Sequence, residues 1–206
     1  EVGMQGGRIF YYEAKKNWWS RAGLPDKMPI GEPGGPDTEM FYEFSDIEHD
    51  PKFGKQCHPN CDCGRYLEIG NNVFMTYKKV GEGKFELLPN KNVDFGGGLE
   101  RMTAASNNDA DVFTIDVFAS IIGTLEELSG KRYSDKTHTA SFRIIADHIR
   151  ASVFLIGDGV IPSNTEQGYF VRRLLRRAIR YWDKLGIAGE GLAQLVNPIA
   201  DCYQDS

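Results

Sequence analysis

The pattern of apolar and polar positions changes near residue 98. Before that point, short runs of aromatic and β-branched residues alternate with Gly, Pro and Asn, which is typical of strands joined by loops. The clearest runs are 9–12, 40–42, 66–69, 73–77 and 84–88. The last two flank the short Gly81-Glu82-Gly83 segment, so they predict a β-hairpin.

After residue 98 the apolar positions recur with the period of a helix. We expect helices over 98–106, 111–129, 141–156 and 166–185. A run of strands followed by a run of helices predicts an α+β fold. The expected domains are an antiparallel sheet domain over 1–107 and an all-helical domain over 108–206.

Composition and charge exclude several classes of protein. With 41% hydrophobic and 26% charged residues, the 206-residue chain has a globular composition. Its 24 basic and 29 acidic residues give a net charge of -5, which argues against a globally basic nucleic-acid binder. No apolar run approaches the ~18 residues that span a bilayer, so we expect no membrane partner. The start has neither Met nor a secretory pattern, and we therefore expect a cytoplasmic piece of a longer chain.

One helix carries a local excess of basic charge. The predicted helix 166–185 has an apolar stripe on one face and, on another, like charges one turn apart: Arg172, Arg173, Arg176, Arg177 and Arg180. Two interpretations stay open. Acids from elsewhere in the fold could pair with these arginines, or the guanidinium forks could bind phosphates. Base contacts would then come from the helix start, where Asn164 is available, although Asn164 could equally be a turn or cap residue. Ser163 and Glu166 fit a capping box there.

A glycine-rich junction joins the last predicted strand to the first helix. Gly96, Gly97 and Gly98 would let the backbone approach a ligand, and the helix N-terminus would favour an anion, although a plain turn explains the glycines as well. Arg101 could hold a phosphate. Asp94 could accept a hydrogen bond from a substrate ammonium or could be an Asx-turn residue.

A cysteine-rich loop is a candidate zinc site. Cys57, His58, Cys61 and Cys63 place four soft ligands within seven positions, and His49 lies nearby in the sequence. Structural Zn²⁺ takes such S and N ligands, although the spacing is tighter than usual. The alternative is a reduced surface loop without a metal.

Taken together, these motifs resemble the alanyl-tRNA synthetase family, which belongs to class II. Residues 93–101 are similar to the family's motif 3, and residues 147–178 are similar to its tRNA-recognition region. The resemblance begins near residue 17 and is most specific from 143 to 180. It implies an incomplete class II sheet followed by the helical tRNA-recognition domain. It also implies activation of alanine by ATP with Mg²⁺ and transfer to tRNA.

The resemblance also implies residue roles. In the alanine pocket, Asp94 would bind the ammonium, Gly96 would leave room for only a methyl group, and Trp19 would form a wall. Asn71 and Val73 would line the pocket and meet the carboxylate. Gly98 and Arg101 would bind ATP. The residues that would grip the acceptor stem of alanine tRNA, with its G·U pair, are Asn164, Arg172, Arg173, Arg176 and Arg177.

Some features depart from the family pattern. Phe95 stands where a small polar residue is more usual, and Asn71 is followed by a second asparagine. Class II motifs 1 and 2 should precede Trp19 but are not found there. We therefore expect negligible ATP–pyrophosphate exchange by these residues alone, and we expect the missing parts of the parental synthetase as partners. The alternative is a non-catalytic acceptor-stem binding module or paralogue.

Overall fold

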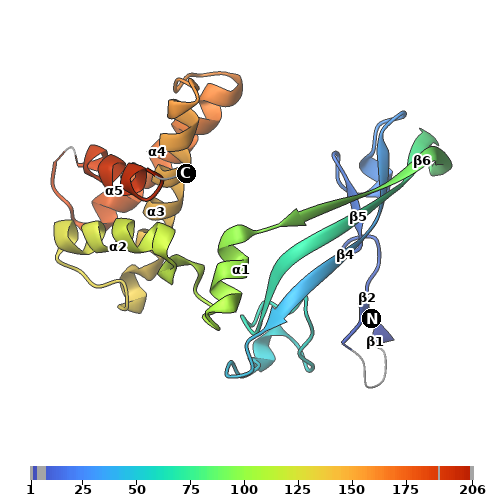
Figure 1. Cartoon of the computed structure of the whole chain (residues 1–206), viewed down its shortest axis with the longest axis horizontal. Coiled ribbons are helices and arrows are strands. Elements are labelled where there is room, and N and C mark those ends of the chain that lie inside the picture. The colour runs from blue at the N-terminus through green and yellow to red at the C-terminus, as the bar shows by residue number, and fades with distance from the viewer. Residues whose placement is uncertain (1, 4–7, 190, 205–206) are drawn as a thin grey trace. The chain divides into compact units, whose positions relative to one another are not determined.

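The computed structural model describes residues 2–3, 8–189 and 191–204, and it divides into two units (Figure 1). The first unit is Glu1–Val112 and the second is Phe113–Ser206. The sequence placed the domain boundary at 107/108, in the turn and short loop that precede this division. The prediction of an α+β fold is confirmed, because a sheet lies in the first unit and a group of helices in the second.

The first unit is built on a four-stranded antiparallel sheet of order β3-β4-β5-β6. Its strands are β3 Trp18–Ser20, β4 Pro33–Glu43, β5 Tyr66–Gly81 and β6 Lys84–Gly97. The short strands β1 Val2–Gly3 and β2 Phe10–Tyr11 form a separate pair. Two 3-10 turns, η1 Pro25–Lys27 and η2 Pro51–Phe53, lie in the connections.

The predicted hairpin is confirmed and is longer than expected. Gly81 pairs with Lys84 across a two-residue turn, and Gly83 takes the left-handed φ of 61° that glycine tolerates. The runs predicted at 66–69 and 73–77 are parts of one strand, β5. Both hairpin strands extend along the sheet to the glycine-rich junction at Gly97 (Figure 1).

Strand β4 starts at Pro33 in a Pro-Gly-rich stretch, ahead of the predicted run 40–42. Gly34 and Gly35 pair with β3, and β4 there passes close to β5. A Cβ at Gly35 would collide with the backbone carbonyl of Phe74. Glycine is therefore used here because two backbones approach closely, which outweighs its poor strand propensity.

Helix α1 Leu99–Ser106 follows the sheet directly and packs back on β5. Its buried residues are Ala104 and Ala105, and Val73 of β5 is also buried in this unit. Small side chains let the helix lie close to the strands, so the glycine-rich end of β6 is held near the start of α1.

The second unit contains α2 Asp116–Ser129, α3 Lys136–Gly157, α4 Glu166–Leu185 and α5 Val196–Asp201, with 3-10 turns η3 Val112–Thr114 and η4 Leu192–Leu195. Helix α4 has the predicted bounds. Helix α3 begins at Lys136 rather than at 141, because the Asp135 carboxylate caps it by accepting from the Thr137 N–H. The predicted helix over 111–129 instead starts at Asp116, after η3, and α5 was not predicted.

Apolar stripes of the helices form the core of this unit. The fully buried residues come from α2, α3, α4 and the segment after α4: Ile121, Leu125, Phe142, Ile145, Val171, Leu185, Leu195 and Ile199. Among the helices that the structure describes, none is long and apolar enough to cross a membrane.

Two glycine substitutions test this architecture. Gly35→Ala places a methyl group into the Phe74 carbonyl, so we expect it to destabilise the sheet unit by about 3 kcal/mol or more. Gly123→Ala is the matched control, because a Cβ there meets nothing within 4 Å and Gly123 lies inside α2. It should stabilise the helical unit by about 0.5–1 kcal/mol.

The measurement is urea unfolding followed by tryptophan fluorescence. Trp18 and Trp19 report on the sheet unit, and Trp182 reports on the helical unit. An unchanged sheet transition in the Gly35→Ala variant would contradict the close approach of β4 to β5.

Candidate functional site

The strand register brings four predicted alanine-binding residues together. Asn71 of β5 pairs with Gly96 of β6, and Val73 pairs with Asp94. Residues that pair directly, and residues two apart on one strand, share one face of a sheet. These four positions therefore form a compact block on a single face. Trp19 lies on β3, where it pairs with Gly35, and its side chain is 44% exposed.

Phe95 lies on the opposite face of the sheet. Phe95 pairs with Asn72, so its ring points away from Asp94 and Gly96 and lies against Gly70 and Gly97. The departure from the family pattern at Phe95 thus falls on the other face of the sheet, behind the block of four.

Asp94 and Gly96 are exposed, whereas Val73 is buried at the base of the block. Within the described ranges, the Asp94 carboxylate has no hydrogen-bond or ion-pair partner. A Cβ at Gly96 would meet nothing within 4 Å. The first unit by itself therefore does not limit the side chain of a ligand at Gly96, and the expected restriction to a methyl group stays a prediction.

A buried polar pair lies beside this block. Asp37 pairs with Val73 across β4 and β5, and its Oδ2 accepts a 3.0 Å hydrogen bond from Asn71 Nδ2. The other oxygens, Asp37 Oδ1 and Asn71 Oδ1, are buried and have no partner among the described residues. Burial raises the pKa of Asp37, although the Asn71 hydrogen bond opposes the rise. Two unsatisfied acceptors side by side require a donor, which a water or a ligand can supply.

Carboxylates also gather along β4 and β5. Burial raises the pKa of Glu39, against a hydrogen bond from Asn60, and the charge of Glu68 raises it further. Glu68 itself is bound by Arg101, whose Nη1 donates to the Glu68 Oε2 at 3.0 Å and to its backbone carbonyl at 3.1 Å. The ion pair is part-exposed and so adds little stability, but it directs the Arg101 guanidinium toward the sheet. Gly98, the N-cap of α1, has no side-chain cap.

Sequence reasoning missed a pocket of about 1200 Å³ along β4. It lies between residues 8–12 and 36–43, and its lining includes Asp37 and Glu39 but not Asn71, Asp94 or Gly96. No local pattern marks it, because its two sides are separated in the sequence and meet only in the fold.

The arginine face of α4 is exposed to solvent. Within the part of the chain that the structure describes, Arg172, Arg173, Arg176, Arg177 and Arg180 are all exposed and none has an ion-pair or hydrogen-bond partner. The interpretation in which acids of the fold neutralise them therefore has no support within the described residues. Tyr169 and Phe170, 47% and 52% exposed, lie on the same helix and were not predicted as site residues.

The start of α4 differs from the predicted capping box. The N-cap is Thr165, and Ser163 bonds instead within the turn, where its Oγ donates to the Thr165 carbonyl. Ser163 N–H also donates to the Gly168 carbonyl, and a Cβ at Gly168 would collide with Ser163 and Ile161. Gly168 thus holds the 161–165 turn against the helix. Asn164 is exposed there, with no hydrogen bond to any described residue.

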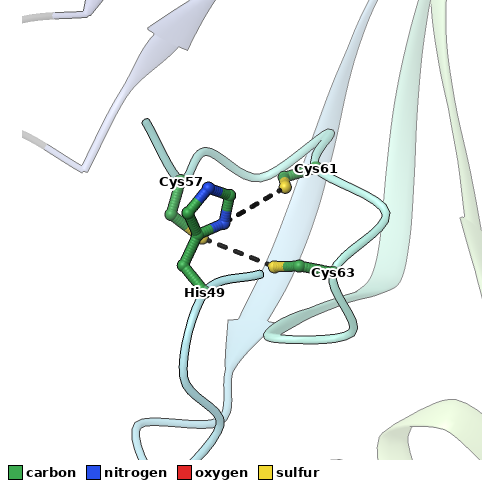
Figure 2. Close-up of side chains that lie close together, drawn as sticks. All are labelled: His49, Cys57, Cys61 and Cys63. Carbon is green, nitrogen blue, oxygen red and sulfur yellow. Dashed lines mark hydrogen bonds between the residues drawn. The ribbon is translucent and has the colours of Figure 1, made fainter. Parts of the chain in front are cut away.

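The cysteine loop forms a compact cluster, but its histidine differs from the prediction. One ligand atom from each of Cys57, Cys61, Cys63 and His49 lies within 4.8 Å of the others. Figure 2 shows these side chains converging from opposite sides of the loop. His58 is not part of the group, and its Nδ1 instead faces the Tyr12 hydroxyl at 2.9 Å. The structure therefore corrects the predicted ligand set, with His49 in place of His58.

The thiols of Cys57 and Cys63 differ in pKa. Burial raises the pKa of Cys57 to about 11, and its hydrogen bond to Cys63 adds to the rise. Burial also acts to raise the pKa of Cys63, but hydrogen bonds from His49 and the Arg65 backbone outweigh it and lower that pKa to about 6.

The buried carboxyl of Asp37 gives a test by pH. Because its pKa is raised in the folded chain, the folded state favours the neutral form, and stability is lost as the pH rises through the folded pKa. We expect Asp37→Asn to raise Tm relative to the unchanged chain, with a gap that is small near pH ~3 and grows toward neutral pH. Thermal melts across this range measure it, with Asp46→Asn as a control at an exposed carboxyl. A gap that shrinks toward neutral pH would contradict the burial of the charge.

Known proteins match nearly the whole chain. Residues 1–206 match the family described as tRNA synthetases class II (A). The chain is 43% identical over 197 residues to "Alanine--tRNA ligase" of Treponema denticola. This alignment covers 93% of the chain and 31% of that protein. It is 41% identical to the proteins of the same name from Borrelia hermsii and Exiguobacterium sibiricum, over 98% and 100% of the chain and 33% and 22% of the relatives.

The chain thus spans a third or less of the length of these curated relatives. The family resemblance read from the motifs is confirmed over the whole sequence. The chain belongs to the class II (A) tRNA synthetases, among which the relatives it matches are alanine–tRNA ligases.

Proposed function

We propose that this chain supplies an amino-acid-binding sheet face and an acceptor-stem-binding helix to an alanine–tRNA ligase. The reaction is the ATP-dependent activation of alanine and its transfer to alanine tRNA, and its setting is the cytoplasm. The observation that carries the proposal is the pairing of Asn71 with Gly96 and of Val73 with Asp94, which gathers a small, acceptor-rich block on one exposed face.

The block suits the ammonium end of an amino acid. Asp94 on β6 offers a free carboxylate, while Asp37 Oδ1 on β4 and Asn71 Oδ1 on β5 are acceptors without partners in the described residues. An ammonium group has three donors and no acceptor, so a face rich in acceptors suits it. One N–H of Asn71 serves Asp37, which leaves the other for the substrate carboxylate.

ATP with Mg²⁺ is the cofactor that the family implies, and residues at the end of the block fit it. The N-terminus of α1 at Gly98 and the Arg101 guanidinium are a phosphate-binding pair, and Glu39 offers oxygen ligands to a hard cation. Bound ATP would supply the leaving group for adenylate formation. The chain's own residues would position the two reactants, which is most of what this reaction requires.

The arginine face of α4 suits the backbone of an RNA stem. Five exposed guanidiniums without acidic partners can bind phosphates bidentately, and Tyr169 and Phe170 can stack on bases or sugars at the same end. Asn164 stands at the helix start with its amide free, so it can contact a base edge of the G·U pair.

A second candidate is a non-catalytic acceptor-stem binding module. It is favoured because all five arginines of the proposed RNA face lie within the helical unit. The sheet face, in contrast, leaves the side chain of a ligand at Gly96 unrestricted and has a pocket alongside β4. The two candidates differ in whether the sheet binds alanine, and they share the RNA contact.

Asp94→Asn tests the amino-acid site. It removes the charge that would meet the ammonium, and a charge-assisted hydrogen bond of about 1.5–3 kcal/mol corresponds to a loss of about 10- to 100-fold in kcat/KM for alanine. The assay is ATP–pyrophosphate exchange with class II motifs 1 and 2 supplied by the parent chain or in trans. Asp46→Asn is the matched control. Undiminished exchange by the Asp94→Asn variant would favour the non-catalytic module.

Arg176→Ala with Arg177→Ala tests the RNA face. If both guanidiniums contact phosphates, the log-log salt slope of binding should fall by about 2, because each contact contributes ~0.9. Fluorescence anisotropy with an acceptor-stem duplex at several salt concentrations measures this. Arg132→Ala is the control, since Arg132 is exposed but paired with Glu126 outside α4. Asn164→Ala should keep the slope and lose the preference for the G·U duplex; an unchanged slope in the double variant would refute the contact.

A further inference from the structure

We propose that His49, Cys57, Cys61 and Cys63 bind one Zn²⁺, which holds the long loop between β4 and β5 in place. The four residues converge from separate turns of residues 44–65 (Figure 2). Three sulfurs and one imidazole nitrogen form a complete tetrahedral ligand set, which leaves no open position. The site is therefore structural, and it is separate from the amino-acid and RNA sites.

The distances match tetrahedral zinc. With Zn–S near 2.3 Å and Zn–N near 2.0–2.1 Å, two sulfurs lie about 3.8 Å apart, and a sulfur and a nitrogen lie about 3.6 Å apart. In the structure Cys57 Sγ and Cys63 Sγ are 3.6 Å apart, and Cys61 Sγ is 3.6 Å from His49 Nδ1. Two of the six ligand–ligand distances thus already match a zinc tetrahedron, and all four ligand atoms lie within 4.8 Å of one another.

The surroundings of the ligands have the pattern of a metal site. His49 Nε2 lies 2.9 Å from the Gly54 carbonyl, to which it can only donate, so Nδ1 keeps its lone pair toward the cysteines. Metal-binding histidines usually donate their second N–H in this way. The bond to Gly54 orients His49 before any ion arrives.

Few other interactions stabilise the middle of the loop between β4 and β5. Between Phe44 and Arg65 the only regular element is the 3-10 turn η2, and the only buried side chains are Phe44 and Cys61. The ion pair of Arg65 with Glu43, at 2.8 Å, closes the base of the loop. Loops of this length are seldom ordered without a core, and small segments without a core use a metal or disulfide instead.

A disulfide explains the cluster less well. The 3.6 Å between Cys57 and Cys63 sulfurs is far from the ~2.05 Å of an S–S bond, and all three cysteines are free. A disulfide would use two sulfurs and leave the third cysteine and His49 without a role. One ion uses all four groups.

The proposed ion would order contacts toward the sheet. Residues 58–60 lie between the ligands Cys57 and Cys61, and from there Asn60 Nδ2 donates to Glu39 Oε2 at 3.4 Å while His58 contacts the Tyr12 hydroxyl. A loop fixed by zinc thus places Asn60 beside Glu39 of β4 and His58 beside Tyr12.

Metal analysis of the 206-residue chain tests the proposal. After purification in zinc-supplemented buffer without chelator, we expect about one Zn²⁺ per chain by elemental analysis. His49→Ala should lose most of this metal, whereas His58→Ala and Cys202→Ser should keep it. Less than about 0.2 equivalents in the unchanged chain, or metal retained by His49→Ala and lost by His58→Ala, would overturn the ligand set.

Thiol counting gives a measurement that needs no folded variant. Of the four cysteines only Cys202 is exposed, so a thiol reagent should label one sulfur quickly and three more only after a chelator is added. In the Cys202→Ser variant, no thiol should be labelled quickly and three should be labelled after the chelator is added. Fast labelling of three or four thiols before chelation would refute the site, and so would a Cys57–Cys63 disulfide that a reductant, but not a chelator, opens.

Discussion

The antiparallel register of β5 between β4 and β6 is the constraint on which the sheet unit depends. It sets Asp37 and Asp94 on either side of Val73, and it sets Gly96 beside Asn71. A shift of one residue would turn the acidic side chains to the other face and bring Phe95 to this one. The register is secured by the tight turn at Gly83 and, near the middle of β5, by Gly35, where backbone contact with Phe74 leaves no room for a side chain.

The proposed sites are places where the fold leaves polar groups unsatisfied. Asp37 Oδ1 and Asn71 Oδ1 are buried without partners in the described residues, and the arginines of α4 repel one another in solvent. Neither arrangement helps the chain to fold. Such local conflicts mark function when the rest of the unit is consistent, as it is here in the packed stripe of α4. The net charge of -5 conceals the basic face of α4, because the acids of the first unit outnumber the bases on that one helix.

Local patterns predicted those features whose causes are local. The period of α4, the turn of the β5–β6 hairpin and the α+β order could all be read from neighbouring residues. The Asp37–Asn71 pair could not, because its members are joined only by strand pairing. His58 was chosen as a zinc ligand because it adjoins Cys57 in the sequence, whereas the fold brings in His49 and turns His58 toward Tyr12. The side on which Phe95 lies also depends on strand pairing, which turns its ring away from Asp94 and Gly96.

The three sets of residues are stabilised by different physical means, so they respond independently to their surroundings. Backbone hydrogen bonds hold the block on β5 and β6, and these are insensitive to salt. Helix α4, which carries the arginine face, is held by its buried apolar stripe. Salt therefore weakens the binding of anions to the arginines without changing the helix. The cysteine loop has almost no core, so its order depends on what its thiolates bind. If the loop binds zinc as proposed, a change in metal supply would reach Glu39 through Asn60 and leave α4 as it is, so loop order is separate from the proposed RNA contact.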